Sequence, residues 1–385
     1  MHFDLDHVFN RQGTDSKKWS QYPDDVLPMW VADTDFAMAP PIVEALRKRL
    51  EHPLLGYSVA QDALRQTLVD YLWNTYAWRI EPQELVFLPG VMPGVNMALN
   101  ALLPAGTGTV VQTPNYQPLR TAARSWDLPC VELPYAADPT GEFPTDMTAL
   151  DLALEDAGAL LFSNPLNPLG KVYSSEELHL IAQACEQHNV LIISDEIHAD
   201  ILFDGRRHVP IASLSPQAAR RTVTLMSASK AFNIAGLKTA FAVIQEPTLR
   251  RRFEAGRMGM VDSVNALGLE ATRAAYGESG DWLAQMRAYL QANRDWLIDA
   301  VPRCLPGVTM HVPQGTYLAW LDCTALGLGD PQNFFLENAK VALSAGPEFG
   351  PQFGQFVRLN FGCPRALLEE GMARLAGSLL ARAKQ

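Results

Sequence analysis

The sequence has few cysteines and no pattern among them. Its five cysteines are scattered along 385 residues, and no two of them form a C-x-x-C pair. An odd, scattered set does not build a disulfide framework, and it lacks the spacing of a zinc site. We therefore expect free thiols in a reducing compartment and no metal site.

The chain also lacks an excess of positive charge and any long apolar run. It has 31 basic and 42 acidic residues, a net charge of −11, whereas nucleic acids and anionic membranes bind basic surfaces. No apolar stretch approaches the ~20 residues that a membrane-spanning helix needs. The N-terminus, MHFDLDHVFN, has no secretory pattern. A cytoplasmic protein without a nucleic-acid or membrane partner is expected.

What is present is an ordinary globular composition in which short apolar runs alternate with helical stretches. Hydrophobic residues make up 48% of the chain, enough for two packed domains. From about residue 85 the alternation predicts an α/β fold with a largely parallel sheet. The expected strands span residues 85–88, 109–112, 159–162, 190–194, 222–226 and 240–245. Between them lie helical stretches such as 175–188.

The pattern divides the chain into three parts. Residues 1–45 are irregular and Pro-rich, and we expect them to pack against the C-terminal domain. Residues 46–280 contain the α/β alternation and form the large domain. Residues 281–385 begin with a long helical stretch and predict a smaller α+β domain. Its expected strands span residues 316–322, 341–344 and 356–361, before a terminal helix.

Polar clusters follow four of the strands predicted for the large domain. They are P-G-V-M at 89–92, N-P-L-N-P at 164–168, D-E-I-H at 195–198 and S-A-S-K at 227–230. Ligands of parallel α/β sheets bind beyond the carboxyl ends of the strands. The four clusters therefore predict one site at one edge of the sheet.

Lys230 and Asp195 are the residues of these clusters with the clearest chemistry. Lys230 follows a buried strand and lies among small residues, where loss of water favours the neutral, nucleophilic amine; a surface lysine on a loop is the alternative. Asp195 ends an apolar strand, and a buried carboxylate needs a cation; a helix cap is the alternative. An enzyme of pyridoxal 5′-phosphate (PLP) needs such an amine and an anion beside the pyridine nitrogen.

PLP also needs a phosphate site. Gly90 opens a turn into a helical run, so the backbone N–H groups of Val91 and Met92 would face an anion. Ser227 would add a hydroxyl group and Lys238 a positive charge. Turns of this kind are common, so this turn predicts a phosphate site only in combination with Ser227, Lys238 and the other residues of the predicted site.

A stacking surface and an anion-binding arginine complete the set. Tyr116 follows another strand end, where its ring could cover the cofactor; a half-buried core tyrosine is the alternative. Arg358 lies inside an apolar strand pattern. An inward arginine there would bind a carboxylate with both arms of its guanidinium group, whereas an outward one would be a solvated charge.

The order of these motifs resembles a known family. The sequence has N-P-x-N-P at 164–168, S-D-E-I-H at 194–198, S-x-S-K-x-F-N-I-A-G-L at 227–237 and R-L-N at 358–360. It resembles PLP enzymes of fold type I in the class I/II aminotransferase group, and more narrowly the MalY/PatB branch of cystathionine β-lyase-like carbon–sulfur lyases. G-T-D-S-K-K-W at 13–19 and L-P-M-W-V-A-D at 27–33 add to the likeness, which spans about residues 3–375.

The resemblance implies a fold and a set of roles. The large domain would hold a mostly parallel seven-stranded sheet between helices. Lys230 would hold PLP covalently and then move protons, Asp195 would pair with the pyridine nitrogen, and Asn167 would bind the phenolic oxygen. Tyr116 would stack on the ring and, with Lys230, is one of the two expected catalytic residues. The remaining roles are binding of the substrate α-carboxylate by Arg358 and binding of the phosphate by Gly90, Val91, Met92, Ser227 and Lys238.

The resemblance further implies a homodimer. Tyr57 would reach the phosphate and substrate of the neighbouring subunit. Residues 30–36 would wall the substrate pocket, with Asp33 as a substrate-binding residue. His198, a further cofactor-binding residue, stands where aminotransferases usually carry a tyrosine, as in the lyase branch, and Lys238 stands where they carry an arginine. The substitution at His198 favours a lyase.

The leading functional hypothesis is β-elimination from L-cystathionine or a related S-substituted cysteine, which yields a thiol, pyruvate and ammonia. An aminotransferase on the same scaffold is the first alternative, and a keto-acid-dependent half-reaction would favour it. A regulatory protein that binds a transcription factor is an alternative of another class. A partner that still binds after Lys230→Ala would favour that alternative.

Overall fold

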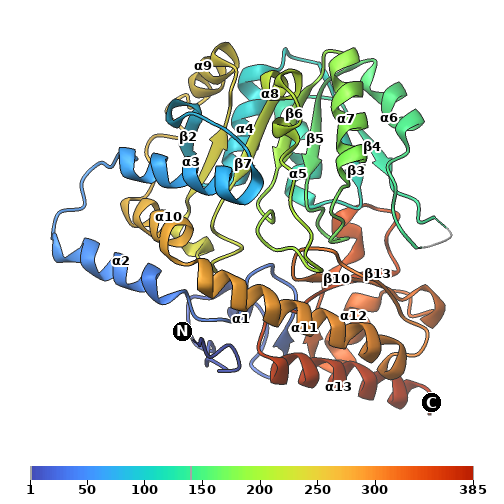
Figure 1. Cartoon of the computed structure of the whole chain (residues 1–385). Coiled ribbons are helices and arrows are strands. Elements are labelled where there is room, and N and C mark those ends of the chain that lie inside the picture. Colours follow the sequence, from blue (N-terminus) through green and yellow to red (C-terminus); the bar gives the residue numbers. More distant parts are fainter. Residues whose placement is uncertain (1, 139–140, 385) are drawn as a thin grey trace.

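Two sheets organise most of the chain. The computed structural model describes residues 2–138 and 141–384. A seven-stranded sheet forms the upper part of the molecule in Figure 1, and a four-stranded sheet lies below it. Among the described residues, no helix is long and apolar enough to cross a membrane.

The seven-stranded sheet is mostly parallel. Only β8 runs opposite to its neighbours β2 and β7, while the other pairs are parallel. In spatial order the strands are β2 (Leu85–Leu88), β8 (Ala240–Val243), β7 (Thr222–Met226), β6 (Leu191–Asp195), β5 (Ala157–Ser163), β3 (Gly108–Thr113) and β4 (Cys130–Pro134). The predicted α/β class and the mostly parallel seven-stranded sheet are confirmed.

Eight helices accompany this sheet in the described part of the chain. Several begin at residues whose side chains accept the free N–H groups of the first turn: Ser174, for example, accepts the Glu177 N–H at 3.1 Å. The helices are α3 (Asp62–Tyr76), α4 (Val91–Leu102), α5 (Gln117–Thr121), α6 (Met147–Leu154), α7 (Ser175–Gln187), α8 (Pro216–Arg221), α9 (Pro247–Ala255) and α10 (Ala266–Glu278). Short 3₁₀ helices are η1 (Pro82–Glu84), η2 (Ala122–Trp126), η3 (Ile211–Ser213) and η4 (Ala235–Leu237).

Both faces of the large sheet are buried. Successive side chains of a strand point to opposite faces, and in the central strands both sets are apolar. Leu161 and Ile193 share one buried cluster with α4 and α9, whereas Leu160 and Ile192 share another with α6 and α7. This double burial explains why the strands are continuous hydrophobic runs in the sequence.

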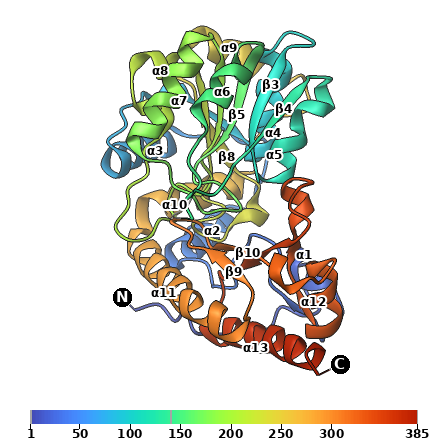
Figure 2. The same cartoon turned by 90° about the vertical axis from the view of Figure 1, so that its right-hand side faces the viewer.

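The second sheet belongs to the C-terminal part of the chain and is antiparallel. Its strands, in spatial order, are β12 (Ser344–Ala345), β13 (Phe356–Asn360), β10 (Leu318–Asp322) and β9 (Thr309–His311). Helices α11 (Gly280–Cys304), α12 (Pro331–Ala339) and α13 (Arg365–Arg382) accompany it, with η5 (Thr324–Leu326) and η6 (Gly346–Phe349). Figure 2 shows α11 and α13 along the bottom of the molecule, away from the large sheet.

The N-terminal segment joins this second part. Its elements are α1 (Lys17–Ser20), β1 (Leu27–Pro28) and the start of α2 (Pro40–Glu51). β1 pairs in parallel with β11 (Val341–Ala342), and the Asn360 N–H donates to the Met29 carbonyl at 2.9 Å. These contacts agree with the expected packing of residues 1–45, while the boundaries after residues 45 and 280 stay predictions.

Several predicted elements are wrong in extent. The stretch 341–344 is two short strands, β11 and β12, rather than one, and residues 1–45 contain regular elements. Three strands went unpredicted, β1, β4 and β9. β1 has only two residues. β4 and β9 have mostly exposed or half-buried residues at the edge of a sheet, so they lack the buried apolar run that identifies a central strand.

Candidate active site

Five turns that carry the predicted site residues lie at one edge of the large sheet. β5, β6 and β7 are adjacent and parallel, and β2 runs in the same direction because β8 is antiparallel to both β2 and β7. Their carboxyl ends lead to residues 164–168, 195–198, 227–230 and 89–92, and β3 leads to Tyr116. The topology therefore confirms the convergence predicted from the order of strands and polar clusters.

Lys230 lies in the turn after β7 with its side chain half-buried. Its Nζ donates a hydrogen bond to the Ala32 carbonyl oxygen at 2.6 Å. Burial, followed by the nearby positive charge of Arg358, lowers the pKa of Lys230 to about 8. A substantial share of this amine is therefore neutral near pH 8, which is the form that attacks an aldehyde or accepts a proton.

Asp195 ends β6 and is 6% exposed. Its Oδ1 accepts the Ile197 N–H at 3.1 Å, so it caps the local turn as well as lying in the site. Burial raises the pKa of Asp195 to about 6, even though the charge of Lys230 acts in the other direction. Within the described residues no cation forms an ion pair with this carboxylate, and a bound cation would be strongly favoured there.

Arg358 points inward from β13, as the inward alternative predicts. It is 5% exposed and donates to Asn167 Oδ1 at 3.0 Å, the Trp30 carbonyl at 2.6 Å and Ser344 Oγ at 3.0 Å. Its Nε is buried without a hydrogen-bond partner among the described residues. Burial lowers the pKa of Arg358 to about 10, so the guanidinium remains charged at neutral pH and retains donor capacity for an anion.

His198 and Tyr116 line the same region. His198 is 3% exposed, and its Nδ1 has no partner in the described part of the chain. Burial and then the charges of Lys230 and Arg358 hold the pKa of His198 well below its usual range, so the imidazole is neutral. Tyr116 is 37% exposed, and burial and the charge of Asp195 raise the pKa of its hydroxyl group.

The predicted phosphate-binding residues follow the ends of β2 and β7 or lie just before β8, and they differ in whether their polar groups already have hydrogen-bond partners. Gly90 precedes α4, whose first-turn N–H groups at Val91 and Met92 lack intrahelical acceptors. Ser227 Oγ lies 2.6 Å from the Thr239 carbonyl oxygen, and it accepts a hydrogen bond from a neighbouring N–H group. Lys238 is exposed, close enough for its charge to lower the pKa of Lys230.

Tyr57 is not brought to this site within the single chain. It lies in the loop between α2 and α3 with 96% of its surface exposed. Asp33 is near the site, because its charge acts on the pKa of Lys230. However, the Asp33 carboxylate also lies 3.3 Å from the guanidinium of Arg11, so part of its charge is offset.

The structure adds one residue that the sequence did not indicate, Tyr317, and a shared contact with Lys230 through the Ala32 carbonyl. Tyr317 is fully buried and donates its hydroxyl group to the Ala32 carbonyl at 3.0 Å. That same carbonyl receives Nζ of Lys230. Nothing in an Ala or in a strand tyrosine marks this contact, since it depends on a backbone oxygen and on residues that are nearly 200 or more positions apart.

A family model connects these features with known proteins. The model for "Aminotransferase class I and II" matches residues 25–375. The chain belongs to this family. The membership accounts for the mostly parallel sheet.

Members of the family with assigned names are similar over nearly the whole chain. The chain is 36% identical to cystathionine beta-lyase PatB of Bacillus subtilis, covering 96% of this chain and 98% of the relative. It is 34% identical to protein MalY of Escherichia coli, covering 98% and 99%. The crystal structure of a PLP-bound C-S lyase from Staphylococcus hominis superposes with a TM-score of 0.92 at 29% identity, covering 99% of each chain. The resemblance to the MalY/PatB branch is thus confirmed.

Proposed function

We propose that this protein is a PLP-dependent carbon–sulfur β-lyase that converts L-cystathionine or a related S-substituted cysteine into a thiol, pyruvate and ammonia. The observation that carries the proposal is the location of Lys230 and Asp195, which both lie at the carboxyl ends of two adjacent strands. One supplies an amine with a lowered pKa, and the other a buried carboxylate with a raised pKa. The similarity to a protein named cystathionine beta-lyase supports the choice of reaction.

The buried polar groups of the site fit PLP. Asp195 would pair with the protonated pyridine nitrogen, which supplies the cation that this carboxylate otherwise lacks. Lys230 would bind the aldehyde carbon through Nζ. The Asn167 Oδ1 is already occupied by Arg358, so its amide N–H groups would donate to the phenolic oxygen. Tyr116 would stack on the ring.

The phosphate group would lie at the start of α4. The N–H groups of Val91 and Met92, next to Gly90, would donate to it at the positive end of the helix dipole. Ser227 would have to redirect its hydroxyl group from the Thr239 carbonyl. Lys238 would add charge without the two-armed geometry of an arginine.

The substrate would be held between Arg358 and the segment that contains Asp33. Arg358 would bind the α-carboxylate, and the charged fork would fix the orientation of Cα. The chemistry that PLP supplies when bound is an electron sink for the pair left at Cα. Nζ of Lys230 would take the Cα proton, a step that its pKa of about 8 suits near neutral pH. His198, whose pKa lies well below its usual range, is too weak a base to compete for this proton.

The test separates a lyase from an aminotransferase. Purified protein with PLP is given L-cystathionine without a keto acid, and free thiol and pyruvate are measured. Both products should accumulate over many turnovers. Amino-group transfer that stops after one turnover, and resumes only when a keto acid is added, would replace the lyase by the aminotransferase.

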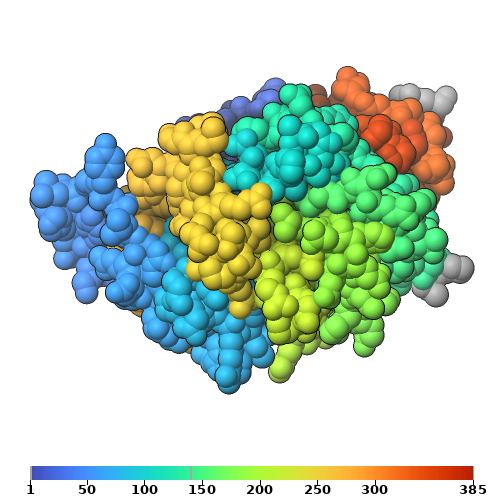
Figure 3. All heavy atoms as spheres, turned by 90° about the horizontal axis from the view of Figure 1, so that it is seen from above, coloured from blue at the N-terminus to red at the C-terminus, as the bar shows by residue number. Residues whose placement is uncertain are grey.

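We also propose a homodimer in which Tyr57 completes the neighbouring site. Tyr57 projects from a surface that exposes Leu54, Leu55 and Val59, and it lines a pocket with residues of the segment 254–269. Figure 3 shows this face, with the blue segment around residues 50–60 beside the yellow one around 250–265. Such an apolar surface on a loop is typical of an interface between subunits.

Mixed dimers test this arrangement. Tyr57→Ala and Lys230→Ala proteins are each expected to be nearly inactive. After they are mixed and allowed to exchange subunits, random pairing should restore about a quarter of the wild-type sites, because one site of each mixed dimer has both residues. No recovery despite subunit exchange would mean that Tyr57 acts within its own subunit, and full activity of Tyr57→Ala alone would mean that it takes no part in the site.

We place the protein in the cytoplasm. All five cysteines are free thiols, as is typical of a reducing compartment. Burial raises the pKa of Cys185, Cys323 and Cys363 to about 12 in each case. These three thiols therefore act as small apolar groups of the core.

A further inference from the structure

Residues 30–34 form a segment whose five consecutive carbonyl groups are all held by side chains, and we call it the carbonyl strap. Its ends are held by backbone bonds: the Met29 N–H donates to the Ala342 carbonyl and the Asp35 N–H to that of Gly362. Each carbonyl group between these ends accepts a hydrogen bond from at least one side chain. The donors are Arg358 and Ser344 for the carbonyl of Trp30, and Asn360 for that of Val31. They are Lys230 and Tyr317 for the carbonyl of Ala32, Asn360 and Lys18 for that of Asp33, and Arg11 for that of Thr34.

This arrangement bears on the proposed reaction through Ala32. Nζ of Lys230 lies 2.6 Å from the Ala32 carbonyl oxygen, and the Tyr317 hydroxyl group holds the same oxygen at 3.0 Å. Among the described hydrogen bonds, this is the only one that Nζ forms. The carbonyl group therefore determines where the amine of Lys230 points whenever it is not bound to a cofactor.

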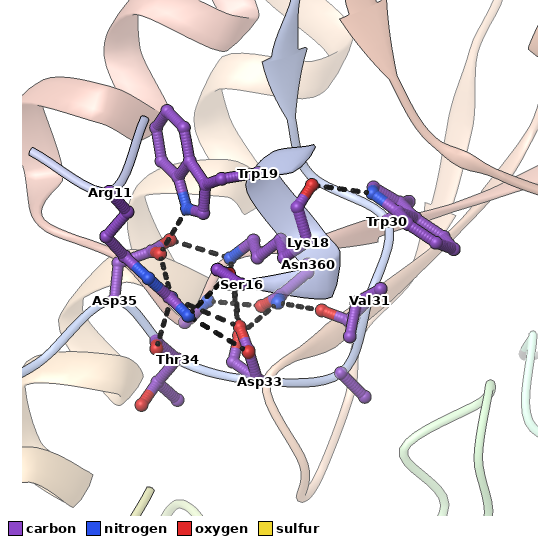
Figure 4. Close-up of polar contacts among 12 residues, drawn as sticks. Arg11, Ser16, Lys18, Trp19, Trp30, Val31, Asp33, Thr34, Asp35 and Asn360 are labelled. Carbon is purple, nitrogen blue, oxygen red and sulfur yellow. Dashed lines mark hydrogen bonds and ion pairs between the residues drawn. The ribbon is translucent and has the colours of Figure 1, made fainter. Parts of the chain in front are cut away.

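Two charged residues hold the strap next to Ala32. Lys18 is 1% exposed, and its Nζ donates to Asp35 Oδ2 at 2.6 Å and to the Asp33 carbonyl at 3.3 Å. Arg11 donates to Asp35 Oδ1 at 2.6 Å and to the Thr34 carbonyl at 3.3 Å. Figure 4 shows both side chains converging on Asp35 and on the strap beside it.

Asp35 is the centre of this cluster. Burial alone would raise its pKa, but Lys18, the indole N–H of Trp19 at 2.9 Å and Arg11 together hold the pKa of Asp35 below its usual range. Asp35 therefore stays ionised, and each of its two carboxylate oxygens has a cationic partner. If Lys18 is removed, a nearly buried carboxylate loses one of the two cations that lie 2.6 Å from its oxygens, so water must enter or Asp35 must move.

We propose that Lys18 and Arg11 are positioning residues, which act through Asp35 and the carbonyl strap to hold the Ala32 carbonyl against Nζ of Lys230. This inference rests on the proposed function in one respect only, the use of that amine to take the Cα proton. Loss of the strap would leave Lys230 present but misdirected. A misplaced proton-transferring group lowers the rate of the chemical step while binding of the substrate is retained.

The test uses Lys18→Met, which keeps the length of the side chain and removes its charge. In the PLP-loaded enzyme we expect kcat to fall about 10- to 100-fold, with KM for L-cystathionine and the affinity for PLP unchanged. Lys17→Met is the matched control, because Lys17 is exposed on the same short helix and bonds to no strap carbonyl. Arg11→Met is the second variant; its guanidinium is 24% exposed, which makes folding of this variant easier to retain.

A second measurement needs neither cofactor nor activity. In the cofactor-free protein, Lys230 is labelled with a small amine-reactive acetylating reagent and followed by mass spectrometry of its peptide. Lys18→Met and Arg11→Met should label Lys230 several-fold faster than wild type and Lys17→Met. Unchanged labelling together with unchanged kcat in either folded variant would overturn the proposal. Absence of lyase activity in the wild type would refute the proposed function, while the labelling comparison would still decide the role of the strap.

Discussion

Replacing Asp195 by asparagine should make the cofactor-free protein more stable above pH 6. Burial raises the pKa of this carboxyl group from 3.8 to about 6 in the folded protein. A difference of one pKa unit corresponds to about 1.4 kcal/mol, so the ionised carboxylate destabilises the fold by about 3 kcal/mol at neutral pH. Asparagine keeps the acceptor for the Ile197 N–H and has no charge to bury.

The direction in which the stability changes with pH follows from proton binding. Between pH 4 and 6 the folded protein binds the proton of Asp195 more tightly than the unfolded chain, so the contribution of this group to stability falls as the pH rises. The penalty is about 2 kcal/mol at pH 5 and about 3 kcal/mol at pH 7.5. Both cofactor-free proteins are unfolded in urea at these two pH values. The stability advantage of Asp195→Asn over the wild type should be larger at pH 7.5 than at pH 5, by about 1 kcal/mol.

Asp35→Asn is the control of opposite sign. Asp35 is also buried, but its cationic partners hold its pKa below the usual range, so its ionised form stabilises the fold and the variant should lose stability at pH 7.5. The reasoning is refuted if Asp195→Asn gains nothing on raising the pH. The carboxylate would then already have a cation within the protein, and the site would not be built to receive one.

Further predictions concern substrate binding and packing. Arg358→Met should raise KM for L-cystathionine by about 10- to 100-fold, because a charged hydrogen bond to the carboxylate contributes about 1.5–3 kcal/mol; an unchanged KM in steady-state assays would exclude Arg358 as the carboxylate site. Gly94→Ala should destabilise the protein by about 1–3 kcal/mol, since a Cβ atom there would lie 2.5 Å from Leu225 Cδ2 and 2.8 Å from Leu88 Cδ1. Gly377→Ala, on α13 with no atom within 4 Å of the added Cβ, should instead raise the unfolding temperature slightly. Equal thermal shifts of the two glycine variants would contradict this packing argument.

The sequence was sufficient for the central strands of the large sheet and for the polar turns at their carboxyl ends, but not for the edge strand β4. Strands such as β6 and β7 are buried on both faces, so each is a short run of mostly apolar residues, with two buried threonines in β7, that leads into a polar cluster. Lys230 and Asp195 could be identified because each is a polar residue that directly follows or ends such a run. The parallel topology then brings these two positions to the same edge.

The carbonyl strap could not be predicted from the sequence. Its contacts use backbone oxygens, which are the same at every residue, and their donors come from places as different as Lys18, near the strap in the sequence, and Arg358, 328 positions from Trp30. The burial of Lys18 was equally hidden, because lysines are almost never fully buried unless paired. The role of Tyr57 cannot be read from the structure of one subunit for a different reason. In a single chain Tyr57 lies exposed, and only a second subunit could bring it to a site.

The most direct test of the proposed function measures all three products of L-cystathionine with the PLP-loaded protein and its Lys230→Ala variant, in the absence of keto acids. The wild type should release thiol, pyruvate and ammonia in equal amounts, while the variant should release none although it remains folded. Equal release by Lys230→Ala would contradict the central role of this amine. Transfer of the amino group by the wild type without release of thiol would contradict the β-lyase itself.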